Sequence, residues 1–177
     1  MLQHPLQEAF GLNEKPVEHE KLNTWRENFE GVQYFHPETG MIISGAIDDL
    51  WQNDQGEYVV VDYKATAKSE PVVSLDEEWQ DTYKKQMEVY QWLLRRNGLK
   101  VSNTGYFVYC TGKPDEESFD GKLEFDISII PYQGDDSWVE PVIKQIKETL
   151  EKDEIPSADP KCDYCRYREV LKKAEGC

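Results

Sequence analysis

The sequence predicts a mixed α/β fold (a mixed sheet of the α+β type), in which a central β-sheet is flanked by helices. Stretches with the two-residue apolar period of strands alternate along the chain with longer stretches of helical period. The 177 residues are 38% hydrophobic, which is enough apolar material for one domain with a core. We therefore expect residues 1–177 to form a single domain that ends in a cysteine-containing tail at residues 156–177.

The first half of the chain is predicted to hold one helix and three strands. Residues 16–30 indicate a helix, because Pro16 suits a first helical turn and Gly31 follows the last one. Its apolar face would consist of Leu22, Trp25 and Phe29. The three strands should pair as a meander, because turn sequences separate them; they are expected at residues 32–36, 41–51 and 58–64.

The second half is predicted to hold two longer helices and two strands. One helix should start near Ser74, which has capping-box spacing to Glu77, and should end at Gly98. Gln86 falls within the apolar stripe of this helix, so we expect its amide to have hydrogen-bond partners. The remaining elements are two strands at residues 104–110 and 123–129 and a helix at residues 137–152.

Charge and targeting signals exclude some classes of protein. A net charge of -15 argues against a protein that coats nucleic acid nonspecifically, since such proteins present a large basic surface. The chain has no signal peptide at its start and no apolar stretch that approaches the roughly 20 residues of a membrane span. We therefore expect a cytoplasmic protein in which the four cysteines are free thiols or metal ligands.

A candidate metal site lies where a hydrophobic strand ends. Asp62 and Lys64 point the same way from that strand, and Asp48 lies on the strand before it. Two carboxylates on neighbouring strands are suitable ligands for Mg²⁺, and the carbonyl of Tyr63 would add a third oxygen. Phosphodiester hydrolysis needs a nucleophilic water and neutralisation of charge on the phosphate, and a divalent cation held by carboxylates does both. Lys64 would stand beside the attacking water or the phosphate. The alternative is an ordinary surface ion pair.

Three motifs occur in order over residues 41–92. They are Gly45-x-x-Asp48, Asp62-x-Lys64 and Gln86-x-x-x-Tyr90. In this order they resemble the PD-(D/E)XK nuclease superfamily, and more narrowly its RecB-like branch, which includes the nuclease domains of RecB and AddAB and the CRISPR adaptation exonucleases.

The resemblance implies a restriction-endonuclease-like core and Mg²⁺- or Mn²⁺-dependent hydrolysis of DNA. It makes Asp48 and Asp62 metal ligands and Lys64 the catalytic lysine, whereas Gln86 and Tyr90 would bind substrate. It also implies an exonuclease that favours single strands or DNA ends, in a DNA repair or defence complex with a protein partner. The alternative is a nuclease-fold module with little or no turnover that binds DNA or protein.

The cysteines extend the comparison. Cys162-x-x-Cys165 resembles the carboxyl-terminal cysteines of the iron–sulfur members of this branch, so the resemblance implies an iron–sulfur cluster. The pair alone could instead hold half of a Zn²⁺ site, or remain unliganded. Here Cys177 comes later than the usual third cysteine, and no cysteine precedes Cys110.

Many RecB-like members carry a further metal-binding histidine upstream of the first aspartate. The expectation is that one of the upstream side chains takes this role, or that the chain is a shortened form lacking an amino-terminal segment. The candidates are His4, His19 and His36, with Glu27 and Glu30 as substitutes.

Overall fold

The computed structural model describes residues 6–114, 121 and 123–176, and the chain divides into two compact units. The first unit extends to Pro141 and the second begins at Val142. All strands of the described residues belong to the first unit. Within the same residues, no helix is both long enough and apolar enough to cross a membrane.

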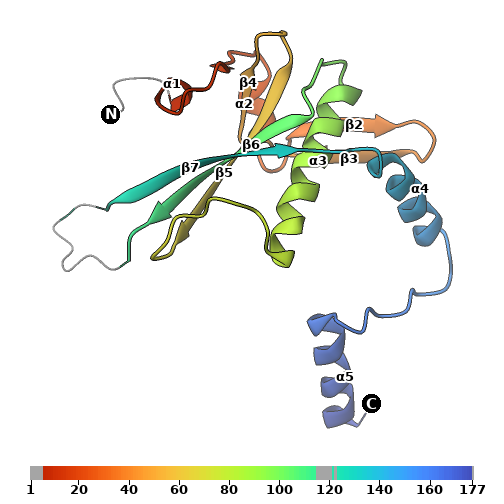
Figure 1. Cartoon of the computed structure of the whole chain (residues 1–177). Helices are drawn as coiled ribbons and strands as arrows, with labels where there is room; N and C mark the ends of the chain where they lie inside the picture. Colours follow the sequence, from red (N-terminus) through yellow and green to blue (C-terminus); the bar gives the residue numbers. More distant parts are fainter. Residues whose placement is uncertain (1–5, 115–120, 122, 177) are drawn as a thin grey trace. The chain divides into compact units, whose positions relative to one another are not determined.

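A five-stranded mixed sheet forms the centre of the first unit (Figure 1). Its strands, in spatial order, are β1 (Lys15–Pro16), β4 (Asp49–Gln52), β5 (Tyr58–Ala67), β6 (Thr104–Gly112) and β7 (Phe125–Gln133). β5 and β6 run parallel, whereas the other neighbouring strands are antiparallel. The predicted fold class, a mixed sheet flanked by helices, is confirmed.

β5 lies in the middle of this sheet and carries the candidate site residues. Its first half, Val59–Val61, is buried on both faces, since none of the three side chains is more than 1% exposed. A run of β-branched residues suits a strand that is covered on both faces. Because β6 is parallel to β5, the chain must cross over between them. The helix α3 (Asp81–Arg96) makes this crossover after the short 3-10 turn η1 (Glu78–Gln80).

A separate two-stranded sheet is formed by β2 (Val32–His36) and β3 (Met41–Gly45), and α3 packs against it. The predicted meander with one strand over residues 41–51 is therefore wrong. At residues 46–48 the chain leaves the strand, because the Ile47 amide donates to the Trp25 carbonyl and the Ile47 side chain is buried. This break places Asp48 in a loop that precedes β4.

The predicted helix over residues 16–30 is also wrong. Its beginning forms β1 beside β4, and only α2 (Leu22–Trp25) is helical. The Val17 amide donates to the Leu50 carbonyl, so the sheet takes backbone groups that a helix would use. Phe29, a residue of the predicted apolar face, is fully exposed.

The helix predicted from Ser74 begins later. The capping box is formed by Glu77 and Gln80, and the Glu77 amide donates to Gln80 Oε1 at 3.0 Å. Residues 71–76 are not helical, and the buried Leu75 anchors this segment. The predicted end is confirmed, because Gly98 adopts a positive φ of 84° directly after the C-cap.

The other elements were predicted in the right order, with shifted ends. The two later strands are β6 and β7, and Leu123 lies outside β7 and is exposed. The last predicted helix is α4 (Val139–Leu150), and the cysteine-containing tail forms a further helix, α5 (Asp163–Glu175), in the second unit. A short helix, α1 (Leu6–Ala9), precedes β1.

Candidate active site

Asp48 lies at the edge of β5 where β4 stops. The β4–β5 pairing ends at Asp49 and Val61, so the Tyr63 amide on that edge has no strand partner. Asp48 takes this place, and its Oδ2 accepts the Tyr63 N–H at 2.7 Å. The N–H and C=O of one strand residue point to the same edge, so the Tyr63 carbonyl also points to the side of Asp48.

Asp62 and Lys64 lie together on one face of β5, as their two-residue spacing predicts. The Asp62 side chain is buried, and its Oδ2 is 2.5 Å from Lys64 Nζ. This ion pair joins a buried carboxylate to a half-buried ammonium. Lys64 also donates to Gln86 Oε1 at 3.1 Å, and its Nζ lies 4.4 Å from the centre of the Tyr83 ring.

Gln86 and Tyr90 extend the site along α3. Gln86 Nε2 donates to the Tyr90 hydroxyl at 2.7 Å, so the half-buried amide has the partners that its position predicts. The Tyr90 ring packs on Gly45, where an added Cβ would come within 2.8 Å of Tyr90 Cε1. The first glycine of the motifs is therefore needed for this close approach. The contacts run continuously from Asp62 through Lys64 and Gln86 to Tyr90.

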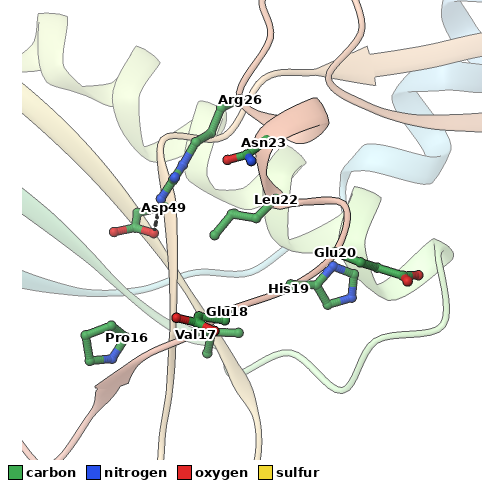
Figure 2. A pocket seen from close by; sticks show the side chains of 9 residues that line it. All are labelled: Pro16, Val17, Glu18, His19, Glu20, Leu22, Asn23, Arg26 and Asp49. Atoms are coloured by element: carbon green, nitrogen blue, oxygen red, sulfur yellow. Dashed lines mark hydrogen bonds and ion pairs between the residues drawn. The ribbon is translucent and has the colours of Figure 1, made fainter.

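The side chain of Arg26 holds the loop that carries Asp48. Arg26 Nε donates to the Asp48 carbonyl at 2.7 Å, and its guanidinium forms an ion pair of 2.6 Å with Asp49 (Figure 2). The other Asp49 oxygen accepts the Tyr63 hydroxyl at 3.0 Å. Arg26 and Asp49 also line a pocket of about 520 Å³ with residues of the 16–23 segment. We refer to Arg26, Asp49 and the Tyr63 hydroxyl as the Arg26 clamp.

The charges in the site oppose each other. Burial raises the pKa of Asp62 above its ordinary value. The Lys64 ammonium partly lowers this pKa again, and the Asp48 carboxylate raises it further. Burial also raises the pKa of Tyr90, and both carboxylates add to this shift. The two carboxylates and the Tyr90 hydroxyl thus lie close enough to influence one another. A cation bound beside the carboxylates would favour their ionised forms.

The donor set fits a small divalent cation. Asp62 is a buried carboxylate paired with Lys64, Asp48 lies close enough to raise its pKa, and the Tyr63 carbonyl points to the side of Asp48. Mg²⁺ prefers one or two carboxylates together with water, so a larger cage of side chains is not needed. Among the described residues, no group of three or more His, Cys, Asp or Glu side chains that could hold a metal ion occurs.

The predicted upstream ligands do not join this site in the described part of the chain. His19 stacks on Trp25 with ring centres 4.5 Å apart. His36 is buried between Thr39 and Glu140, to which its two ring nitrogens are hydrogen-bonded. Glu27 and Glu30 are exposed, and His4 lies outside the described residues.

The cysteine pair belongs to the second unit. Cys162 is the N-cap residue of α5, and Cys165 lies in the first turn. Hydrogen bonds from the backbone and side chain of Cys165 lower the pKa of the Cys162 thiol. Cys110 is half-buried in β6, and Cys177 lies outside the described residues. Binding of zinc or an iron–sulfur cluster by Cys162 and Cys165 stays a prediction.

Several residues of the site have no motif in the sequence. Arg26 reaches Asp48 and Asp49 from another element, so no local spacing reveals it. Tyr83 could have been found, because it precedes Gln86 by three residues on the same helical face. Tyr109 is the register partner of Lys64 on β6 and is buried, but the pairing of β5 with β6 had to be known first.

The comparisons with known proteins agree with this geometry. The family model described as the PD-(D/E)XK nuclease superfamily matches residues 3–170 of the chain. Neither a curated protein nor a solved structure matches the chain. Nucleases of the matched superfamily typically use Mg²⁺ or Mn²⁺.

Proposed function

Because the chain belongs to the PD-(D/E)XK nuclease superfamily, we propose that it is a metal-dependent deoxyribonuclease with its active site at Asp48, Asp62 and Lys64. The observation that carries the proposal is the buried Asp62 carboxylate, which has the Lys64 ammonium 2.5 Å from its Oδ2 and the Asp48 carboxylate close enough to raise its pKa. Such a site can bind a cation on its acidic side and a phosphate on its basic side.

The metal would be Mg²⁺ or Mn²⁺, held by Asp48, Asp62 and the Tyr63 carbonyl. When bound, such a cation supplies a reactive water at neutral pH and neutralises charge on the phosphate. The chain positions its own ligands beforehand. The Tyr63 amide orients Asp48, and the Arg26 clamp fixes the loop behind it.

Lys64 and α3 form the phosphate side of the site. The Lys64 ammonium is held by the Gln86 amide oxygen and lies over the Tyr83 ring, so its charge is fixed in place before substrate binds. A fixed positive charge stabilises the negative charge that develops on the phosphate. The Tyr90 hydroxyl accepts a hydrogen bond from Gln86, which leaves its own O–H to donate to a phosphate oxygen.

The finer assignment concerns the branch and the substrate. The order of Gly45-x-x-Asp48, Asp62-x-Lys64 and Gln86-x-x-x-Tyr90 supports a RecB-like enzyme. We assign it to hydrolysis of DNA from ends or in single strands, in keeping with that branch. The same fold without turnover, acting in DNA or protein binding, is the competing function.

The test uses end-labelled single-stranded and double-stranded DNA with Mg²⁺, Mn²⁺ or EDTA. We expect cleavage by the wild-type protein with either metal, none with EDTA, and none by Asp62→Ala. The matched control is Asp54→Ala, which removes an exposed carboxylate from the turn before β5 and should leave cleavage unchanged.

Two outcomes would contradict the proposal. Cleavage that survives Asp62→Ala would place the active site elsewhere. If a well-folded preparation cleaves neither DNA with either metal, the competing function as a binding module is favoured.

A further inference from the structure

Two aromatic side chains form an exposed step beside Lys64. Trp79 of η1 and Tyr83 of α3 pack edge to face, with ring centres 5.6 Å apart. Trp79 is 51% exposed, although a tryptophan gains much free energy from burial. Tyr83 is the ring on which the Lys64 ammonium lies. One ring therefore separates the exposed indole from the proposed catalytic lysine.

The backbone under Trp79 is fixed. Leu75, which precedes η1, and Gln80, its last residue, are both buried. Gln80 also closes the capping box with Glu77. The Thr82 hydroxyl donates to the Trp79 carbonyl at 2.9 Å. The turn that carries the exposed indole is thus held by its own hydrogen bonds and by two buried side chains.

Each ring of the step has an ammonium group over it. Lys64 Nζ lies over Tyr83, and Lys68 Nζ lies 5.8 Å from the centre of the Trp79 ring. Lys68 directly follows β5, so both lysines come from the same end of that strand. An exposed aromatic ring beside basic groups is the arrangement by which proteins hold single-stranded nucleic acid: the base stacks and the phosphate is neutralised.

We propose that Trp79 and Tyr83 form a stacking subsite for one unpaired nucleobase next to the phosphate held at Lys64. In a duplex the bases are paired and their faces are covered by their neighbours, so the indole can stack only on an unpaired base. The subsite therefore selects single-stranded DNA or a frayed end. This inference rests on the proposed nuclease function and adds to it the structural origin of substrate choice.

The first test is equilibrium binding of dye-labelled oligothymidylate and of a blunt duplex, measured in EDTA at low salt so that no cleavage occurs. Trp79→Ala should weaken binding of the single strand by about 5- to 150-fold and leave duplex binding nearly unchanged. Trp79→Phe should retain most of the affinity. Phe35→Ala removes another exposed aromatic side chain, on β2, and should have no effect.

The second test follows tryptophan fluorescence with unlabelled oligothymidylate. Stacking on Trp79 should quench the emission of the wild-type protein, and the quenching should disappear in Trp79→Ala. If cleavage is observed, Trp79→Ala should raise KM for single strands and leave kcat little changed.

The outcomes separate this inference from the proposed function. Trp79-dependent binding and quenching without any cleavage would support the stacking subsite and contradict the nuclease. Equal weakening of single-strand and duplex binding, or single-strand binding that is unchanged in Trp79→Ala, would overturn the subsite. The latter result would indicate that the step contacts a protein instead. If Trp79→Ala does not fold, the single-strand affinity of Trp79→Phe and the quenching of the wild-type fluorescence still test the subsite.

Discussion

At the scale of single residues, the buried carboxylate of Asp62 stands at the centre of the site. It lies against Lys64, yet burial and the nearby Asp48 outweigh this partner and raise the pKa of Asp62. A folded protein keeps such an unfavourable charge at sites where the charge is used. Removing one member of this group should therefore have different effects on stability and on activity.

Lys64→Ala should lower kcat for DNA cleavage by about 10²- to 10³-fold, because the fixed charge beside the phosphate is lost. Binding of Mn²⁺, measured by calorimetry, should persist, since the carboxylates remain. Lys100→Ala is the control, as it removes a lysine whose side chain is 65% exposed. Loss of Mn²⁺ binding in Lys64→Ala would show that this lysine supports the ligands rather than the phosphate.

Asp62→Asn should make the metal-free protein more stable at neutral pH. The folded-state pKa of Asp62 is raised, so its stabilising contribution is present below the unfolded pKa of about 4 and is lost as the pH rises through the folded pKa. The neutral amide avoids this loss, and Tm should rise by about 2–4 °C for each kcal/mol gained.

Thermal melting in EDTA between pH 4 and 8 checks this expectation. The advantage of Asp62→Asn should grow with pH, and Mg²⁺ should stabilise the wild-type protein more than the variant. Asp54→Asn serves as the matched control. A variant that melts below the wild type at pH 8 in EDTA would mean that the Lys64 ion pair dominates.

The sequence was sufficient to find the residues whose spacing is local. Asp62 and Lys64 share a face because strand side chains repeat every two residues, and Gln86 reaches Tyr90 across one helical turn. Arg26 was not found, because its contact with Asp48 spans 22 residues and depends on where α2 ends.

At the scale of elements, the loop between β3 and β4 determines where Asp48 lies. The loop exists because β3 pairs with β2, whereas β4 joins the other sheet. Its end is fixed from behind by the Arg26 clamp, and its start by the contact of Gly45 with Tyr90. Both supports can be tested by substitutions that leave the carboxylates in place.

Arg26→Ala should raise the Mn²⁺ concentration for half-maximal cleavage by about 10- to 100-fold, as is typical when support of a metal ligand is removed. Arg26→Lys should recover only part of this loss, because lysine cannot make both contacts of the guanidinium. The control is Arg166→Ala, whose side chain is 74% exposed. An unchanged Mn²⁺ requirement would contradict the role of the clamp.

Gly45→Ala should destabilise the protein by about 1–3 kcal/mol, because the new methyl group would overlap the Tyr90 ring. Denaturant unfolding measures the change. Ser44→Ala, at the neighbouring exposed position, should be nearly neutral. In the double variant Gly45→Ala/Tyr90→Ala the two effects should not add, since the second change removes the overlap. Simple additivity would show that the strain comes from another contact.

Element boundaries were the weakest part of the prediction. Residues 16–30 have a helical apolar spacing, but the beginning of this segment pairs with β4 and so belongs to the sheet. Ser74 and Glu77 have the spacing of a capping box, but Glu77 and Gln80 have it too, and only the second pair stands at the helix start. Tertiary contacts determine where these elements begin, and a local sequence pattern contains no information about such contacts.

At the scale of the whole molecule, the fold class was predictable because the order of strands and helices admits few arrangements. The central position of β5 follows from its run of three valines, which needs cover on both faces. The separation of β2 and β3 into a second sheet was not predictable, since the strand pattern continues past Gly45 in the sequence.

The net charge of -15 has a consequence for DNA binding. The protein and the phosphate backbone of DNA are both negatively charged and repel each other. Attraction must therefore come from a bound cation and a few lysines such as Lys64 and Lys68. We expect the affinity for single-stranded DNA to fall only weakly with salt, both in the wild-type protein and in Asp54→Ala. The slope of the logarithm of the binding constant against the logarithm of the salt concentration should be no steeper than about -2.

Fluorescence anisotropy at several salt concentrations measures this slope, in EDTA and with Ca²⁺. Affinity should be higher with the divalent cation. A slope of about -5 or steeper would reveal an extended basic surface and contradict this account.

The order in which the chain is made has a further consequence. The proposed ligands and their support on α3, from Gly45 to Tyr90, precede β6, which pairs with β5 along its whole second half. At a synthesis rate of about 5–20 residues per second, β6 is complete about one to four seconds after Tyr90. During that interval the nascent protein has all of the proposed catalytic side chains but lacks the strand that supports them, so a nuclease site here should become competent only after β6 has been made.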